Sequence, residues 1–428
     1  MLAFIRHYFS PTLRQVILLF LIDMGTNVVD YAFHFYLGWV LQPTDFAIVQ
    51  TVNSALLVAV TVFGMNQPAV ARLVATAAGD EVQGRAIFQT FLGQSSWLGL
   101  ALVGLIGAGR GLIASWLNVP PMAVAIAAAM LWFALTRPVV AGMLQARQQF
   151  WAYGGSRTVY AVSRLGLALI LLTVWTSNAN LALITLPLGA LAALLAGLWA
   201  LGGSVWRRTP RLARNVVVEG WRLSLGALVA YGAFMFLQSV DVIWVNRMFA
   251  PEDAAAFSAV VLFRRLLAVL PGAVVVIMYP RAAALVAQGQ SPARLLRLTT
   301  LGITLPTLLL TLVYFAFGDT LMAVSFGGKY LQAAPLLGWM GVAMLGHGLV
   351  TMWLNFFLVT RPLGYVVALV VAAAGHLLLL TLFGTTLARV TLIFGLTGLL
   401  LTSIGLGFYG LSQRRARPGK WTKVNGTV

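Results

Sequence analysis

A stripe of four polar side chains runs along the first apolar segment, at about residues 15–40. Steps of four, three and four residues separate Asp23, Asn27, Asp30 and His34. This spacing places all four on one side of an α-helix. Because carboxylates are costly in hydrocarbon, we expect this face to line a wet cleft. Three roles stay open: hydrogen bonds between helices, a carboxylate that responds to H⁺ or Na⁺, and wetting of the cleft.

Arginines occupy two other apolar segments. Arg157 and Arg164 lie on one face of the segment at about 153–175, and Arg164 is too deep to reach the membrane surface easily. The adjacent Arg264 and Arg265 lie near the middle of a later segment. These arginines either pair with membrane aspartates or bind an anionic ligand, and the sequence leaves both roles open.

The balance of charge inside the apolar segments favours the second role. Gln238 and Asp241 lie one turn apart on the segment before Arg264, so Asp241 is a candidate partner for one of the arginines. With Arg137 included, the deep arginines outnumber the deep aspartates by five to three. Pairing therefore cannot neutralise all of them, which predicts a cavity with surplus positive charge.

The elements that position these residues are membrane helices. Of the 428 residues, 60% are hydrophobic and 9% are charged, against about 25% charged in a soluble domain. A soluble globule and a disordered chain are both excluded. A membrane helix needs about 20 apolar residues, and the polar stretch 176–180 divides one long run into two. Twelve spans are predicted, at about 15–40, 46–70, 86–108, 119–136, 153–175, 181–206, 224–248, 254–280, 298–318, 330–360, 362–388 and 390–413.

The loops carry most of the 28 Lys and Arg residues, which exceed the 10 Asp and Glu residues. If both termini are cytoplasmic, the cytoplasmic loops and tails hold nineteen of these cations and the outer loops hold four. The positive-inside rule therefore predicts cytoplasmic termini. The basic linker 207–222 and the basic tail 412–428 are expected to contact anionic lipids, so nucleic acid is not needed as a partner.

No sign of enzyme chemistry appears in the loops. The chain has no cysteine, and its four histidines show no metal-ligand spacing. The outer loops are short, without paired carboxylates, a nucleophile–base set or a glycine-rich phosphate loop. We expect no catalytic residue, no metal and no cofactor, which argues against a membrane glycosyltransferase or polymerase.

Three short segments of the first half resemble segments of the second half, in the same order. The pairs are Leu41–Ala47 with Phe249–Ala255, Pro68–Ala75 with Pro280–Ala287, and Met143–Arg147 with Phe357–Arg361. Their offsets are 208, 212 and 214 residues. This predicts a duplication into two six-helix lobes, 1–206 and 207–428, related by a pseudo-two-fold axis along the membrane normal, with a cleft between them.

With these features the chain resembles the multidrug/oligosaccharidyl-lipid/polysaccharide (MOP) flippase superfamily, in its polysaccharide-unit and O-antigen branch. The marks are the Leu-x-Pro-x-Asp-Phe turn at 41–46 and the segment Gly142–Arg147. The resemblance spans nearly the whole chain and implies an alternating-access cavity, lined largely by helices 1, 2, 7 and 8, that moves a lipid-linked sugar outward.

The predicted function is translocation of an undecaprenyl-pyrophosphate-linked oligosaccharide across the bacterial inner membrane, for lipopolysaccharide, capsule or exopolysaccharide synthesis. The headgroup would bind to Arg157, Arg164, Arg264 and Arg265, because guanidinium forks match phosphate oxygens. We expect at least one of the last three to lack a carboxylate partner. H⁺ or Na⁺ is a candidate coupling ion, and a polymerase and glycosyltransferases are candidate partners. The alternative is a multidrug extruder, although cationic drugs favour an acidic cavity.

Overall fold

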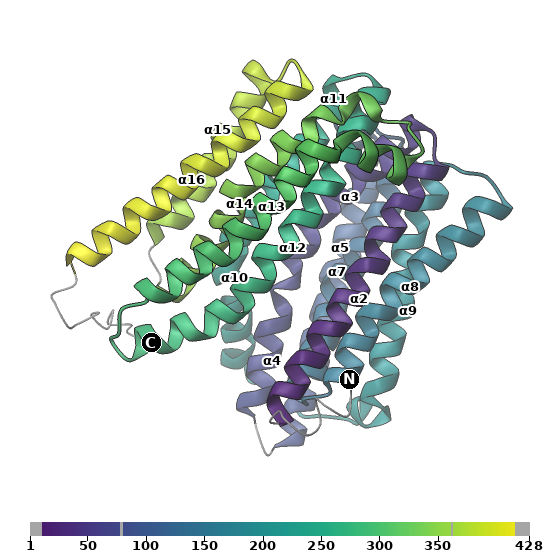
Figure 1. The fold of residues 1–428 in the computed structure, drawn as a ribbon. Coiled ribbons are helices and arrows are strands. Elements are labelled where there is room, and N and C mark those ends of the chain that lie inside the picture. The colour runs from purple at the N-terminus through teal and green to yellow at the C-terminus, as the bar shows by residue number, and fades with distance from the viewer. Residues whose placement is uncertain (1–10, 78–79, 361–362, 416–428) are drawn as a thin grey trace. The chain divides into compact units, whose positions relative to one another are not determined.

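The computed structural model describes residues 11–77, 80–360 and 363–415, which form helices and no strands (Figure 1). The first group of helices is α2 (Pro11–Val40), α3 (Pro43–Gly64), α4 (Asn66–Thr76), α5 (Glu81–Ala108), α6 (Arg110–Leu117), α7 (Pro121–Ala146), α8 (Phe150–Val174), α9 (Ala179–Leu201) and the short η1 (Gly203–Trp206). The second group is α10 (Arg214–Leu237), α11 (Val240–Met248), α12 (Pro251–Ala287), α13 (Ala293–Phe326), the short η2 (Leu331–Ala333), α14 (Pro335–Thr360), α15 (Leu363–Phe383) and α16 (Leu387–Arg415). Most of the predicted basic tail, residues 416–428, lies outside the described ranges.

The helices account for most of the predicted spans by length and composition. Among the described residues ten helices are long and apolar enough to cross a membrane, and the bent pair α10–α11 makes up to eleven. Helix α2 is 30 residues long but carries the polar stripe. The chain is therefore a multi-pass membrane protein, while the count of twelve and the cytoplasmic termini stay predictions.

Local sequence explains where several helices start and stop. Pro43 and Pro251 each open a helix after a residue in extended conformation, which suits a residue that lacks a backbone N–H. Between α8 and α9, Asn178 accepts a hydrogen bond from the backbone of Leu181 at 2.9 Å and caps α9. The predicted division of the long apolar run at 176–180 is confirmed.

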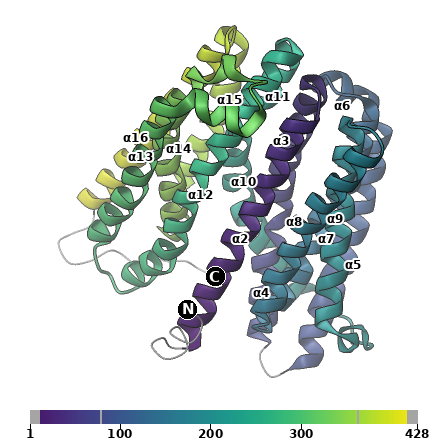
Figure 2. The same ribbon diagram turned by 45° about the vertical axis from the view of Figure 1, so that its right-hand side comes forward.

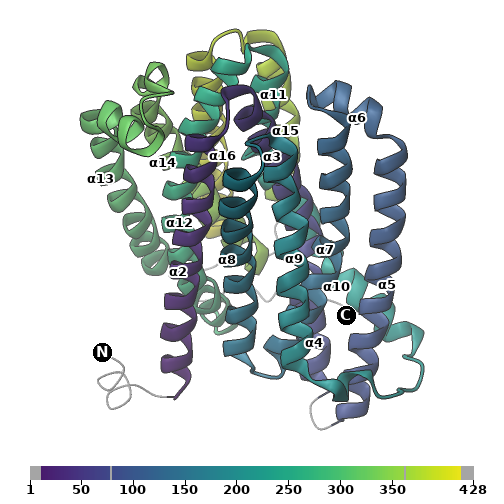
Figure 3. The ribbon, with the colours of Figure 1, turned by 90° about the vertical axis from the view of Figure 1, so that its right-hand side faces the viewer.

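The chain divides into two compact units, Met1–Gly232 and Ala233–Val428. In the first unit α7 is the central helix and packs against α3, α4, α5, α6, α8 and α9, while α2 packs along α8 (Figures 2 and 3). In the second unit α14 is central and packs against α12, α13, α15 and α16. The helix pairs α5–α7, α7–α9 and α8–α9 of the first unit match the pairs α13–α14, α14–α16 and α15–α16 of the second. A duplicated helical unit predicts this repetition of the same helix pairs in the same order.

The division between the units falls 26 residues after the predicted lobe boundary at 206, because the predicted linker packs on the first unit. Trp221 donates a hydrogen bond to Gln94 at 2.9 Å and packs on the ring of Phe91. The linker region thus contains the start of α10, and the helix bends by 40° only at Gln238–Ser239, between α10 and α11.

A glycine of the Gly142–Arg147 segment has a packing role. A Cβ atom on Gly142 would lie 2.7 Å from the backbone oxygen of Gln67 and 3.2 Å from the backbone nitrogen of Ala71. Helix α7 therefore touches α4 through its backbone, in the way that small residues allow in membrane bundles.

We expect Gly142→Ala to lower the thermal stability of the purified protein, since the methyl group would meet backbone atoms that cannot rotate away. Overpacking of this kind costs about 1–3 kcal/mol. Gly155→Ala on α8 is the matched control, because its Cβ would meet nothing within 4 Å. Equal melting temperatures for the two variants would contradict the close contact of α7 with α4.

Candidate functional site

Two ion pairs join α2 to α8 in the first unit. Arg157 donates to Asp23 at 2.5 Å, and Arg164 donates to Asp30. Both aspartates belong to the predicted stripe, and their side chains are 41% exposed. Because both helices repeat their charges at a spacing of seven residues, the carboxylates of α2 and the guanidinium groups of α8 meet at two successive levels, and Figure 3 shows α2 beside α8.

The two pairs differ in burial. The side chain of Arg164 is 3% exposed, whereas that of Arg157 is 39% exposed. Arg164 also lies over the ring of Phe33, with 4.0 Å from Cζ to the ring centroid, and over the ring of Tyr160 at 5.1 Å. Rings that face a cation stabilise it when water is absent. Arg164 is therefore held on three sides, and Arg157 mainly by one carboxylate.

The other members of the stripe have separate surroundings. His34 is buried, and its Nδ1 lies 3.1 Å from Nε2 of Gln50 on α3. Asn27 is half-buried between the two aspartates. The stripe thus contacts α8 at its aspartates and α3 at His34, and the exposure of its aspartates stays consistent with the predicted cleft.

Arg137 on α7 is a third arginine near the two pairs. Its guanidinium group lies 4.5 Å from the ring centroid of Tyr160. No ion pair joins it to a carboxylate within the described ranges. Around α2, α7 and α8 the first unit thus places three arginines, Arg137, Arg157 and Arg164, with the two aspartates of α2. The excess of arginine over aspartate in the sequence anticipated such a residue, but nothing in the spacing singled out Arg137.

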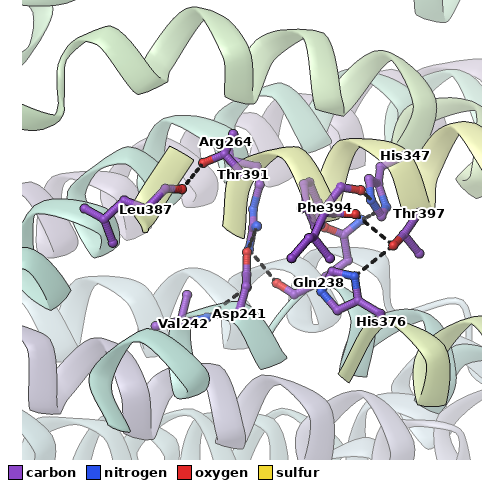
Figure 4. A network of polar contacts seen from close by, with 11 residues as sticks. Gln238, Asp241, Val242, Arg264, His347, His376, Leu387, Thr391, Phe394 and Thr397 are labelled. Atoms are coloured by element: carbon purple, nitrogen blue, oxygen red, sulfur yellow. Dashed lines mark hydrogen bonds and ion pairs between the residues drawn. The ribbon is translucent and has the colours of Figure 1, made fainter. Parts of the chain in front are cut away.

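The second unit contains a fully buried ion pair at the bend between α10 and α11. Arg264 on α12 is 1% exposed, and Asp241 in the first turn of α11 is 0% exposed (Figure 4). The guanidinium group contacts both carboxylate oxygens and donates to the backbone oxygen of Gln238 at 2.7 Å. The prediction that Asp241 pairs with a membrane arginine is confirmed.

An aromatic and histidine cluster surrounds this pair. The ring of Phe394 on α16 lies 4.3 Å from Cζ of Arg264 and stacks on His347 of α14, with the ring centroids 3.8 Å apart. Nε2 of His347 donates to the backbone oxygen of Phe394 at 2.9 Å, and Nε2 of Gln238 lies 3.4 Å from Nδ1 of His347. His376 of α15 joins Thr397 at 2.9 Å (Figure 4). Sequence reasoning missed both histidines, because 29 residues separate them and no helical spacing links them.

Two of the three arginines for which the sequence predicts at least one missing carboxylate partner have such a partner, and for Arg265 this stays a prediction. Arg164 and Arg264 are buried beside carboxylates, since a guanidinium group in a packed helix bundle needs a counter-charge. Arg265 is half-buried on α12. Among the described residues no three His, Cys, Asp or Glu side chains are placed to hold a metal ion.

The comparisons with known proteins extend these findings. A multidrug resistance MATE family transporter of the MOP superfamily, in an inward-facing conformation, has a TM-score of 0.74 at 12% identity, over 91% of this chain and 96% of its own. The lipid II flippase MurJ, in an inward closed conformation, has a TM-score of 0.76 at 10% identity, over 92% of this chain and 87% of its own. The eukaryotic MATE transporter AtDTX14 has a TM-score of 0.66 at 13% identity, over 93% and 96%. The fold is therefore that of the transporters and flippases of the MOP superfamily.

A family model described as polysaccharide biosynthesis protein matches residues 12–286. The chain belongs to this family. A search of curated proteins finds no match. The expected resemblance to the MOP superfamily is confirmed, and its polysaccharide branch is consistent with the matched family.

Proposed function

We propose that this protein is a flippase of the bacterial inner membrane that moves an oligosaccharide linked to undecaprenyl pyrophosphate to the outer leaflet. Lipopolysaccharide, capsule or exopolysaccharide synthesis would consume the product. The observation that carries the proposal is the surplus of positive charge around α2, α7 and α8. There Arg157 and Arg164 pair with Asp23 and Asp30, while Arg137 contacts the ring of Tyr160 and forms no ion pair with a carboxylate within the described ranges. The matched family, described by polysaccharide biosynthesis, and the fold shared with a lipid II flippase support it.

The mechanism follows from the chemistry of the headgroup. A pyrophosphate carries several negative charges, and guanidinium groups bind phosphate oxygens through paired N–H donors. Surplus guanidinium charge inside the bundle would offset the cost of moving that headgroup through the membrane, while the lipid tail stays in the bilayer. Alternating exposure of the bound headgroup to the two sides completes the transfer. Asp23 and Asp30 are the groups through which H⁺ or Na⁺ would act.

The alternative of multidrug extrusion shares the fold but fits the charge less well. A cationic drug would meet uncompensated positive charge at Arg137. Like charges in a site of low dielectric repel strongly. The buried carboxylate Asp241 offers no compensation, because Arg264 occupies both of its oxygens.

A reconstitution experiment tests the proposal. Purified protein in liposomes should speed the transfer of an undecaprenyl-pyrophosphate oligosaccharide with a fluorescent sugar label, measured by the share of label that external dithionite reduces. In protein-free liposomes only the outer-leaflet half should react quickly. Ethidium uptake is the parallel assay for drug transport. Transport of ethidium together with no acceleration of the labelled lipid would overturn the proposal in favour of the extruder.

A further inference from the structure

A cavity of 410 Å³ lies within the first unit, between α3, α4, α7, α8 and α9. Five polar side chains line it, together with apolar ones such as Phe133: Gln67, Arg137, Tyr153, Ser156 and Arg157. No acidic residue is part of its lining. Its volume lies within the range of about 300–1,000 Å³ that small-molecule sites occupy, and its charge is positive.

Of the two arginines that line the cavity, Arg137 is the more available to an anion that enters it. Its contact with the ring of Tyr160 leaves the guanidinium N–H groups without a carboxylate within the described ranges. Charged side chains inside a membrane bundle usually face its interior or a water-filled cavity. The cavity supplies that space.

Arg157 is only partly engaged. A single nitrogen, Nη1, contacts Asp23, and both side chains are about two-fifths exposed, so that the pair gains little from burial. The rest of the guanidinium group is available to the cavity that Arg157 lines. An anion can therefore share Arg157 with Asp23 or replace Asp23 there.

The uncharged groups of the lining also favour a ligand that accepts hydrogen bonds. Nε2 of Gln67 donates to the hydroxyl oxygen of Tyr153 at 3.2 Å, which leaves the hydroxyl hydrogen of Tyr153 for another acceptor. No acceptor for that hydrogen is found in the part of the chain that the structure describes. A phosphate oxygen in the cavity would accept it.

The two arginines lie at similar depth. Arg137 lies nine residues before the end of α7, and Arg157 lies seven residues after the start of α8. A short turn joins these two helix ends, so both arginines lie about 10–14 Å along their helices from the same end. The distribution of basic loops predicts that this end is cytoplasmic, where a lipid-linked sugar is assembled.

We infer that this cavity is a phosphate subsite, in which Arg137 and Arg157 hold the phosphate groups of the headgroup and Arg157 exchanges Asp23 for them. This rests on the proposed function and names the residues that take the anionic part of the substrate. Binding would release the carboxylate of Asp23 and so change the contact between α2 and α8.

Inorganic pyrophosphate is the probe for the site. Titration calorimetry on the full-length protein in neutral detergent, at constant ionic strength, should show Arg137→Gln binding pyrophosphate at least tenfold more weakly than the unchanged protein. Arg110→Gln is the matched control, since Arg110 is exposed and does not line the cavity. It should stay within twofold. Equal weakening by both substitutions would overturn the site, because a general loss of charge would then explain the effect.

If Arg157 exchanges Asp23 for the ligand, removal of the Asp23 carboxylate on α2 should strengthen pyrophosphate binding. Asp23→Asn should tighten pyrophosphate binding severalfold, because Arg157 no longer has to leave a carboxylate. Asp319→Asn removes the same charge from an exposed position outside the cavity and should have no effect. Unchanged or weaker binding by Asp23→Asn would overturn the exchange.

Two further measurements separate this site from the proposed function. Nanodiscs with and without phosphatidylglycerol decide the source of the phosphate: loss of pyrophosphate binding in the anionic discs assigns the site to a phospholipid headgroup, and retained binding assigns it to a diphosphate. In the liposome assay, normal transfer of the labelled lipid by Arg137→Gln would overturn the site and leave the flippase standing. Pyrophosphate binding by a protein that transfers no lipid would overturn the flippase and leave the phosphate site standing.

Discussion

Arg264→Met should strongly deplete folded protein from the membrane. The substitution leaves Asp241, which is 0% exposed, as an uncompensated charge and removes the donor to the backbone oxygen of Gln238. Breaking a buried ion pair by removing one partner costs about 3–5 kcal/mol, which is a large part of the stability of a typical protein. Fluorescence-detected size exclusion of the tagged protein and its melting temperature measure the loss.

A double variant separates the contribution of charge from that of packing at the Arg264–Asp241 pair. Arg264→Met with Asp241→Leu removes both charges, and we expect it to be more stable than Arg264→Met alone. The coupling between the two positions should exceed about 1 kcal/mol, within the range for groups in contact. Arg389→Gln is the control, because Arg389 is exposed and its guanidinium group donates to the hydroxyl of Thr385 rather than to a carboxylate. A double variant as unstable as the sum of its single variants would contradict the pairing.

Asp30→Asn should destabilise the first unit more than Asp23→Asn does, although both replace the same group on the same helix. The difference comes from the partner: Arg164 is 3% exposed and Arg157 is 39% exposed. The buried guanidinium group loses its counter-charge at a cost of about 1–3 kcal/mol. The half-exposed group is solvated, and such pairs contribute about 0–1 kcal/mol.

Thermal unfolding in detergent measures this order, with Asp30→Glu as the conservative variant that restores the charge. The order also bears on coupling. If Asp30→Asn unfolded no earlier than Asp23→Asn while transfer of the labelled lipid was lost, the burial explanation would fail and a coupling role for Asp30 would stand in its place.

Much of the helical framework was present in the sequence. Proline at the first turn of a helix, the polar stretch at 176–180 and the length of the charge-free runs predict the helix ends and the membrane class, because these signals act within a few residues. The excess of deep arginines over deep aspartates is likewise a property of composition. It predicted that some guanidinium group would lack a carboxylate before any contact was known.

Only the tertiary structure decided which residues meet. Arg164 lies 134 positions from Asp30, and Arg264 takes Asp241 because α12 packs against α11. His347 and His376 converge on Phe394 from helices that no spacing connects. Arg137 is the residue left over because α7 presents it to Tyr160 and to a cavity, beyond the reach of the aspartates of α2. The position of a charged residue in the sequence determines its depth in the membrane and its face of the helix. Its partner depends on which helices pack together, and the whole bundle determines that packing.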